Sequence, residues 1–324
     1  MNIFCDDGST NVKLAWMDGK ELKTSISGNS FCHDWKVDGI GSGRTFNYQI
    51  DDRKYGYDPV TEASITTTHV EYQYSDANLL AIHHALLNSG LPPAEVHLTV
   101  TLPISEYYTQ DCQKNMANIE RKIANVTRPL TLNKGELFTI ASVDVMPEAL
   151  PAVFSRLARD KVGQYEKSLV IDLGGTTMDT CVIMGQFESV SSVHGNPKIG
   201  VALVTNPTLA ALKMAWSTTS PMMANELIKN RDKDNVVNQF VNDVSKKAMV
   251  LSAIEDAIHD LGNRVVDDLS QFRSVNRVYV LGGGGPLIEA AVRKAWAHLG
   301  DKVVVIDDPQ TALVQAMAYI KQED

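Results

Sequence analysis

The sequence is poor in cysteine and contains no closely spaced cysteine pair. Its 324 residues include four cysteines, which lie far apart in the chain: Cys5, Cys32, Cys112 and Cys181. Scattered single cysteines are typical of reduced thiols, whereas disulfide frameworks and zinc sites use clustered or paired ones. We therefore expect a cytoplasmic protein whose core forms without cross-links.

Long apolar runs and a targeting segment are absent as well. No apolar stretch approaches the roughly 18 residues that span a bilayer. Residues 1–7 lack the basic and apolar regions of a signal peptide. The histidines show no metal-ligand spacing, because the adjacent His83 and His84 would point about 100° apart on a helix. We expect no membrane contact, and we interpret these two histidines as ordinary helix residues.

Positive charge is scarce. The chain has 30 Lys and Arg against 39 Asp and Glu, which gives a net charge of −9. A protein that neutralises the phosphates of DNA or RNA is normally basic, so direct nucleic-acid binding is not expected. Small anionic ligands are still compatible with this charge, because backbone amides and one metal ion can hold them locally.

The composition is otherwise that of an ordinary globular protein. Hydrophobic residues make up 44% and charged residues 21%, which excludes disordered and collagen-like classes. The length predicts two domains and is sufficient for a large core. No low-complexity linker separates two parts, so we expect the domains to meet tightly across a cleft.

A short pattern occurs twice, about half the chain apart. Residues 3–11 and residues 169–177 each run from an apolar stretch into Asp-x-Gly-(Ser/Gly)-Thr. Aligning the two aspartates also pairs a glycine and a threonine: Asp6 with Asp172, Gly8 with Gly174, and Thr10 with Thr176. Similarity at a domain-sized interval predicts two related domains that face one another.

Each copy of the pattern continues as a strand. Apolar residues alternate with others over 12–16, and 178–183 is rich in β-prone residues. Each turn is therefore predicted to join two strands in a hairpin. A Walker loop or a Rossmann turn would lead into a helix instead, and neither consensus is present.

The remaining chain alternates strands with helices and loops. A helix is predicted from Ser75–Asn78 to a C-terminal Gly90, and strands over 96–100, 143–146 and 277–281. Further helices are expected at roughly 148–160, 206–216, 236–272, 286–298 and 309–322. Residues 217–235 are expected to be loops around a short helix, and 39–43 a hairpin tip or loop.

The first turn has the residue types of a phosphate site. Gly8 permits close approach of the backbone, and the amides and hydroxyls of Ser9, Thr10 and Asn11 can surround a phosphate. Asp6 can hold hydrated Mg²⁺, and Lys13 can balance phosphate charge. The same residues are also common in a polar hairpin turn without any ligand. Two such turns, each after an apolar strand, favour the functional interpretation.

The second turn offers the same chemistry. Gly174 and Gly175 remove side chains where a phosphate would approach, and Thr176 and Thr177 supply amides and hydroxyls. Asp172 could face Asp6 across the cleft and share the water shell of one metal ion. A weaker metal candidate is Asp179, which also fits a solvent-facing strand position.

Two further features suggest a nucleotide. Gly282 to Gly285 follow a strand and precede Pro286, so their exposed backbone can contact a base, ribose or phosphate. A tight strand-to-helix connection would need only one glycine. Glu148 is expected to open a helix, where it either interacts with the helix dipole or orders a water that attacks a γ-phosphate.

These residues resemble those of the actin, Hsp70 and sugar-kinase superfamily, and within it most closely the ParM family of bacterial actin-like ATPases. The resemblance spans essentially the whole chain and rests on five segments: 6–11, 72–76, 145–148, 172–177 and 282–285. It implies an α/β, ribonuclease H-like fold with a nucleotide cleft between two related domains. The implied domains are 1–167 with 308–324, and 168–307.

The resemblance also implies roles for single residues. Asp6 and Asp172 become ligands of Mg²⁺ through water, and both hairpins become phosphate clamps. Glu148 positions the hydrolytic water. Gly200 and the glycine run at 282–285 contact the adenosine.

The implied protein is a filament-forming ATPase that segregates plasmid DNA. It polymerises head to tail with ATP, or alternatively GTP, bound, and hydrolyses the nucleotide inside the filament. Filament ends would bind a DNA-binding adaptor of the ParR type on a centromere-like site, without direct contact between this chain and nucleic acid.

Three alternative functions have less support from these residues. A small-molecule kinase of the same superfamily would need an acceptor base and a substrate pocket, and neither has a clear motif. An Hsp70-like chaperone is not expected, because little sequence follows the helix predicted at 309–322. A nucleotide-binding scaffold without turnover is disfavoured mainly by Glu148.

Overall fold

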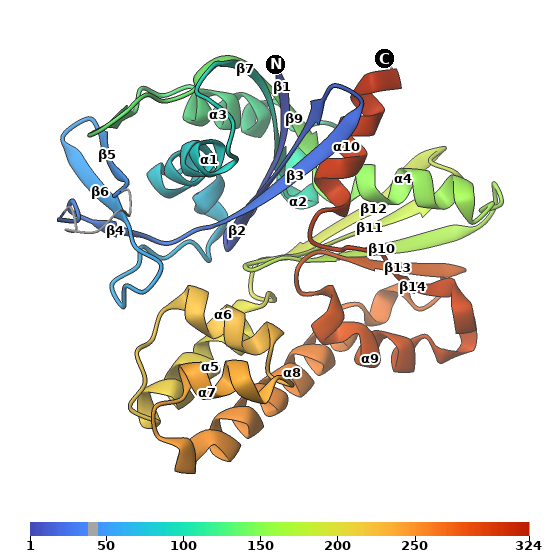
Figure 1. Cartoon of the computed structure of the whole chain (residues 1–324). Coiled ribbons are helices and arrows are strands. Elements are labelled where there is room, and N and C mark those ends of the chain that lie inside the picture. The colour runs from blue at the N-terminus through green and yellow to red at the C-terminus, as the bar shows by residue number, and fades with distance from the viewer. Residues whose placement is uncertain (38–44, 324) are drawn as a thin grey trace.

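Three β-sheets and the helices around them make up the computed structural model (Figure 1), which describes residues 1–37 and 45–323. Within these residues two sheets have five strands each and the third has four. The loop expected at 39–43 lies outside the described residues. The fold is mixed α/β, as the sequence predicts.

The first large sheet has the order β3-β2-β1-β7-β9. Its strands are β1 (Asn2–Asp7), β2 (Asn11–Asp18), β3 (Glu21–Gly28), β7 (Glu95–Leu102) and β9 (Thr139–Pro147). The first three are antiparallel neighbours, whereas β7 and β9 run parallel to β1. Strand β1 is buried from Ile3 to Asp7, as expected for a central strand that is covered on both faces.

The second large sheet repeats this plan, in the order β12-β11-β10-β13-β14. Its strands are β10 (Lys167–Leu173), β11 (Met178–Met184), β12 (Ser189–Asn196), β13 (Arg277–Leu281) and β14 (Val303–Val305). Again three antiparallel strands are followed by two parallel ones. The prediction of related halves is confirmed, and each Asp-Gly turn joins two antiparallel strands.

A small sheet and four helices also belong to the first half. The small sheet has the order β4-β6-β5-β8 and the strands β4 (Phe31–His33), β5 (Asn47–Ile50), β6 (Arg53–Tyr57) and β8 (Thr131–Leu132). The helices are η1 (Val70–Tyr74), α1 (Asp76–Asn88), α2 (Ile104–Tyr107) and α3 (Met116–Val126). Ser75 caps α1 and Gly90 follows it with φ of +83°, so both predicted ends of this helix are confirmed.

His83 and His84 are core residues of α1. The Nδ1 atom of His84 lies 2.8 Å from the Tyr48 hydroxyl, and its ring stacks on Tyr57. Burial lowers the pKa of His83 to about 4 and that of His84 to about 3. Both are therefore neutral near pH 7, as structural histidines in an apolar helix should be.

The second half carries most of the other helices. They are α5 (Ala202–Met214), α6 (Pro221–Lys229), α7 (Asp234–Phe240), η2 (Val244–Lys246), α8 (Lys247–Asp268), η3 (Ser270–Phe272), α9 (Gly285–Ala295) and η4 (Ala297–Lys302). The prediction of a single helix at 236–272 is wrong. The chain is extended at Val241 and Asp243, and the Asp243 side chain accepts from the Ser245 N–H. This local bond competes with helix continuation.

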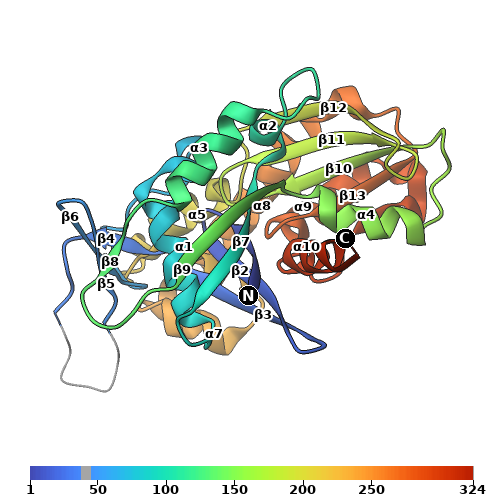
Figure 2. The same ribbon diagram turned by 90° about the horizontal axis from the view of Figure 1, so that it is seen from above.

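Two helices lie between the large sheets. Helices α4 (Leu150–Arg159) and α10 (Ala312–Glu323) pack against each other, and α10 also contacts β1 and β2 (Figures 1 and 2). One apolar cluster joins them to both halves and includes Phe4, Val170, Tyr279 and Met317. The halves therefore share a core on this side of the molecule.

The four cysteines, which all lie within the described residues, form no disulfide bond. No helix among these residues combines the length and apolar character needed to cross a membrane.

Candidate functional site

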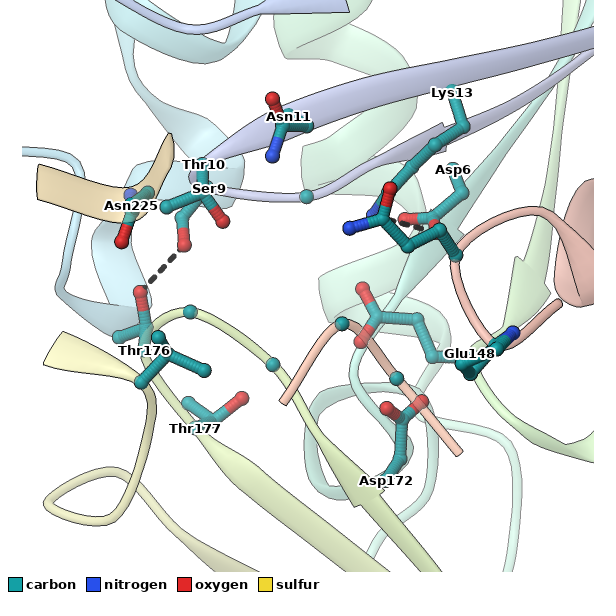
Figure 3. Close-up of a pocket in the computed structure, with 18 of the residues that line it drawn as sticks. Asp6, Ser9, Thr10, Asn11, Lys13, Glu148, Asp172, Thr176, Thr177 and Asn225 are labelled. Atoms are coloured by element: carbon teal, nitrogen blue, oxygen red, sulfur yellow. Dashed lines mark hydrogen bonds and ion pairs between the residues drawn. The ribbon is translucent and has the colours of Figure 1, made fainter. Parts of the chain in front are cut away.

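A cavity of about 280 Å³ lies between the two halves, with walls from both (Figure 3). Most of the site residues expected from the sequence line it: Asp6, Gly8, Ser9, Thr10, Asn11, Lys13, Glu148, Asp172, Gly174, Gly175, Thr176, Thr177, Gly282 and Gly283. The parallel topology explains this convergence, because both Asp-Gly turns lie at the carboxyl ends of central strands. Four expected residues do not line the cavity: Asp179, Gly200, Gly284 and Gly285.

The first hairpin, residues 8–11 between β1 and β2, is held by side chains. The Tyr72 hydroxyl donates to the Gly8 carbonyl at 3.2 Å, and Asn29 Nδ2 donates to the Ser9 carbonyl at 3.0 Å. The backbone N–H of Asn29 donates to the Thr10 carbonyl at 3.0 Å. Three successive carbonyls of the turn are thus occupied by protein donors.

A buried ion pair lies under this hairpin. Asp7 and Lys122 have fully buried side chains that bond to each other. Lys122 also donates to the side chains of Gln73 and Asn78, and the Thr101 N–H donates to Asp7 at 3.0 Å. Asp7 is therefore a structural residue that anchors the end of β1, although it stands next to Asp6.

The second hairpin, residues 174–177 between β10 and β11, is held by backbone. The N–H groups of Val201 and Ala202, at the start of α5, donate to the carbonyls of Gly174 and Gly175 at 3.0 and 2.9 Å. Gly200 allows this approach, because a Cβ there would lie 2.5 Å from the Thr176 carbonyl group. Gly200 thus supports the hairpin from outside the cavity wall.

The hairpins also touch each other. The Thr176 hydroxyl donates to the Ser9 hydroxyl at 2.7 Å across the cavity (Figure 3). Elsewhere, the Ser220 hydroxyl, which caps α6, donates to the Pro59 carbonyl at 2.8 Å. The two halves are therefore joined both between the hairpins and between α6 and the segment that follows β6.

Three carboxylates converge on the cavity (Figure 3). Asp6 is the penultimate residue of β1 and forms a 3.0 Å ion pair with Lys13 on the neighbouring strand. Although burial opposes the charge of Lys13, the Asp6 carboxylate raises the pKa of this lysine. Burial, and then the Asp6 carboxylate, raise the pKa of Asp172 to about 7. Glu148 approaches from the connection between β9 and α4.

Glu148 is not part of a helix, contrary to the sequence prediction. Its N–H donates to the Leu102 carbonyl at 2.8 Å, which continues the pairing of β9 with β7. Ala149 then has φ of +63°, and α4 begins only at Leu150. Interaction with the helix dipole therefore does not explain why a glutamate stands at position 148. Burial and the nearby carboxylates of Asp172 and Asp6 raise its pKa well above the usual range.

The four glycines at 282–285 differ in their surroundings. Gly282 has φ of +82°, and a Cβ on it would lie 2.2 Å from Asp172 Oδ1, so only glycine fits there. A Cβ on Gly283 would meet nothing within 4 Å, so its backbone is open to the cavity. Gly284 packs between Leu173 and Val201, and Gly285 begins α9.

Asp179 has a structural partner. Its carboxylate accepts hydrogen bonds from the N–H and the hydroxyl of Ser105, at 2.9 and 2.7 Å. These bonds join β11 to α2 of the first half. The solvent-facing position considered from the sequence is wrong, because Asp179 is only 2% exposed.

Several residues of the site were not found from the sequence. Helix α6 contributes Asn225, Ile228 and Lys229 to the cavity wall, although its sequence is an ordinary amphipathic helix. Tyr72 lines the cavity, and only the resemblance had drawn attention to its segment. Asn29 and Lys122 carried no signal, because their roles depend on partners far away in sequence.

The cavity fits an anionic ligand that carries a hard cation. Hairpin amides suit phosphate oxygens, and a divalent ion would relieve the repulsion among Asp6, Asp172 and Glu148. Among the described residues, no three His, Cys, Asp or Glu side chains are grouped to chelate a metal by themselves. Magnesium suits such a site, because it keeps several waters and binds substrate phosphates.

Comparisons with known proteins agree with this fold. Residues 1–159 match the N-terminal family model of the plasmid segregation protein ParM, and residues 162–320 match its C-terminal model. No curated protein matches the sequence.

Solved structures of similar fold include filament proteins. A 15-stranded ParM filament from Clostridium botulinum has 15% identity and a TM-score of 0.71, with 100% of this chain and 99% of that chain covered. The archaeal actin homolog Ta0583 in complex with ADP has 17% identity and a TM-score of 0.69, with both chains covered fully. The AlfA filament from B. subtilis plasmid pLS32 has 14% identity and a TM-score of 0.57 over 98% of each chain.

Both halves thus match one family, which is a family of plasmid segregation proteins and not of sugar kinases. With its duplicated sheets and its cleft between two Asp-Gly hairpins, the chain belongs to the actin-like ParM family of plasmid segregation proteins.

Proposed function

We propose that the chain binds a nucleoside triphosphate with Mg²⁺ in this cleft, forms head-to-tail filaments in the cytoplasm, and hydrolyses the nucleotide within them. The observation that carries the proposal is the placement of Glu148, Asp6 and Asp172 in one cavity with both hairpins. ATP is the proposed nucleotide. An archaeal relative binds ADP, and an AlfA filament binds the ATP analogue AMPPNP.

The proposed roles follow from the geometry. The hairpin amides hold the phosphates, and Lys13 and the Mg²⁺ ion offset their charge. Asp6 and Asp172 contact the water shell of the ion, which supplies electrostatic stabilisation of the phosphates when bound. The open backbone at Gly283 is available for the ribose or base.

Glu148 is the proposed catalytic residue. Its raised pKa makes its carboxylate a better proton acceptor than an exposed one, provided that the bound cation keeps it ionised. It orients the attacking water and accepts its proton. A positioned general base typically contributes about 10²–10⁴-fold to a rate.

The proposed partner is a DNA-binding adaptor on a centromere-like site, captured at filament ends. The net charge of −9 supports an indirect connection to DNA. For the division of the chain, we propose domains 1–167 with 308–324, and 168–307. The packing of α10 on β1 and β2 supports this assignment.

The test uses Glu148→Gln in the full chain, with Glu136→Gln as a control at an exposed glutamate. With ATP and Mg²⁺, both variants and the wild type should give a rise in light scattering. Phosphate release by Glu148→Gln should fall at least about 100-fold, whereas the control should match the wild type. A wild type without nucleotide-dependent scattering would contradict the filament proposal, and unchanged phosphate release in Glu148→Gln would remove its catalytic role.

A further inference from the structure

The first hairpin is held by two side chains from outside its own sequence, Asn29 and Tyr72. Asn29 lies in the connection between β3 and β4 and is 7% exposed, and Tyr72 in η1 is 1% exposed. Asn29 does not line the cavity. Their contacts with the hairpin are made to its carbonyl oxygens, as described above.

These two side chains form one donor chain. One hydrogen of the Asn29 amide goes to the Ser9 carbonyl, and the other goes to the Tyr72 hydroxyl at 2.8 Å. The Tyr72 hydroxyl passes its own hydrogen to the Gly8 carbonyl. Each polar side-chain hydrogen of Asn29 and Tyr72 therefore holds the hairpin, either directly or through the other of these two residues.

The orientation of the Asn29 amide is set by its nitrogen. Its Oδ1 atom is buried and has no donor among the described residues. A buried acceptor without a partner costs stability, so the rest of the amide must be held firmly. The hydrogen bonds of Nδ2 to Ser9 and Tyr72 provide this hold.

Fixing the carbonyls also fixes the amides. A peptide group is planar and trans, so its C=O and the next N–H point in opposite directions. The three held carbonyls therefore turn the N–H groups of Ser9, Thr10 and Asn11 away from Asn29 and Tyr72. Among the described residues, the N–H groups of Ser9 and Thr10 have no acceptor in the protein, which leaves them free for an anion.

We propose that Asn29 and Tyr72 are positioning residues that preorganise the first hairpin for the phosphates of the nucleotide. The inference rests on the proposed nucleotide binding. It adds that phosphate affinity depends on a hydrogen-bond chain to the carbonyl groups of the hairpin, in which Tyr72 lines the cavity and Asn29 does not.

The experiment compares Tyr72→Phe with Tyr55→Phe in the full chain. Tyr55 is a matched control, because it is buried in the same half and its hydroxyl donates to Asp76 at 2.5 Å, away from the hairpin. Affinities for Mg-ATP, Mg-ADP and adenosine are measured by competition with a fluorescent ADP analogue. The temperature is chosen so that all variants are folded.

Tyr72→Phe should weaken Mg-ATP and Mg-ADP binding about fivefold, the effect of one net hydrogen bond, and leave adenosine binding unchanged. Tyr55→Phe should leave all three affinities unchanged. Equal loss for adenosine, or no loss for Mg-ATP, would overturn the inference. Absence of nucleotide binding by the wild type would instead refute the proposed function, and the inference with it.

A second variant and a second measurement guard against misfolding. Asn29→Leu keeps the approximate size but removes both amide donors, and it should weaken Mg-ADP binding more than Tyr72→Phe does. In amide hydrogen exchange, Mg-ADP should protect Ser9, Thr10 and Asn11 in the wild type and less in both variants. Equal protection in all three proteins would contradict a positioning role.

Discussion

The two hairpins have the same position in the same topology, yet the rest of the protein supports them differently. The first is held by the side chains of Asn29 and Tyr72 and stands over the buried pair of Asp7 and Lys122. The second is held by main-chain N–H groups at the start of α5. The repeated sequence therefore encodes the surface offered to a ligand, whereas each half supports that surface in its own way.

The aspartates also differ in their neighbours. Asp6 pairs across the strands with Lys13, and Asp172 occupies the same register with Asp179. One aspartate thus has an adjacent cation and the other an adjacent acid. Burial is the main cause that raises the pKa of Asp172 to about 7, followed by the carboxylates of Asp6 and of this neighbour, Asp179.

Removing the buried cation under the first hairpin should have the largest effect. Lys122→Met leaves Asp7 buried and unpaired, which should cost about 3–5 kcal/mol of unfolding free energy. Chemical denaturation measures this loss, with the exposed Lys20→Met as a control. Adding Asp7→Asn to Lys122→Met should restore part of the stability. A loss below about 1 kcal/mol would show that the pair does not support the first hairpin.

Gly200→Ala addresses the backbone support of the second hairpin. The new methyl group would overlap the Thr176 carbonyl group, so the hairpin or α5 must move, at a cost of about 1–3 kcal/mol. Gly283→Ala is the control, because its methyl group meets no atom within 4 Å. Denaturation should separate the two variants. Equal stability would show that α5 can retreat without strain.

The pH dependence of stability tests the difference between the aspartates. An aspartate with a folded pKa of about 7 and an unfolded pKa near 4 binds a proton more tightly when folded. Its contribution to stability is present at low pH and is lost as pH rises to about 7, with a slope of at most about 1.4 kcal/mol per pH unit. Denaturation without nucleotide or divalent ions should show this slope between pH 5 and pH 7.

Asp172→Asn should reduce that slope by up to about 1.4 kcal/mol per pH unit and leave the contribution of Glu148, whose pKa is raised as well. Lys13→Met should extend it to higher pH, because the site then loses a cation. An unchanged slope in Asp172→Asn would assign the titration to another group.

The smallest effect is expected at the contact between the hairpins. Thr176→Val removes the hydroxyl that donates to Ser9 and should cost about 0.5–1.5 kcal/mol. Ser9→Ala should cost about the same, and the double variant little more, because both remove one interaction. Additive losses would show that the two hydroxyls act on separate partners.

Much of the fold could be predicted because it rests on local patterns. Apolar strands that end in Asp-Gly turns predicted both hairpins, and Ser75 and Gly90 predicted the ends of α1. The break near Asp243 was missed, because the helical pattern continues through a residue whose side chain bonds the backbone instead. The start of α4 was placed too early, because a backbone with φ of +63° at Ala149 has no sequence signal.

The site was predictable only on its ligand-facing side. The lining of the cavity by Asp6, Asp172 and Glu148 follows from strand ends, which the sequence marks clearly. Tyr72, Asn29 and Lys122 act through contacts with residues far away in the chain, and nothing in their own surroundings marks them. Asp179 was misjudged because its partner Ser105 belongs to the other half.

The apolar cluster around α4 and α10 couples the unfolding of the two halves. Two halves with the same strand topology would be expected to unfold separately. Phe4 of β1, Val170 of β10 and Met317 of α10 belong to one continuous cluster, so neither half can lose its structure without exposing apolar surface of the other. Unfolding of one half should therefore destabilise the other, even though each half also has an apolar cluster of its own.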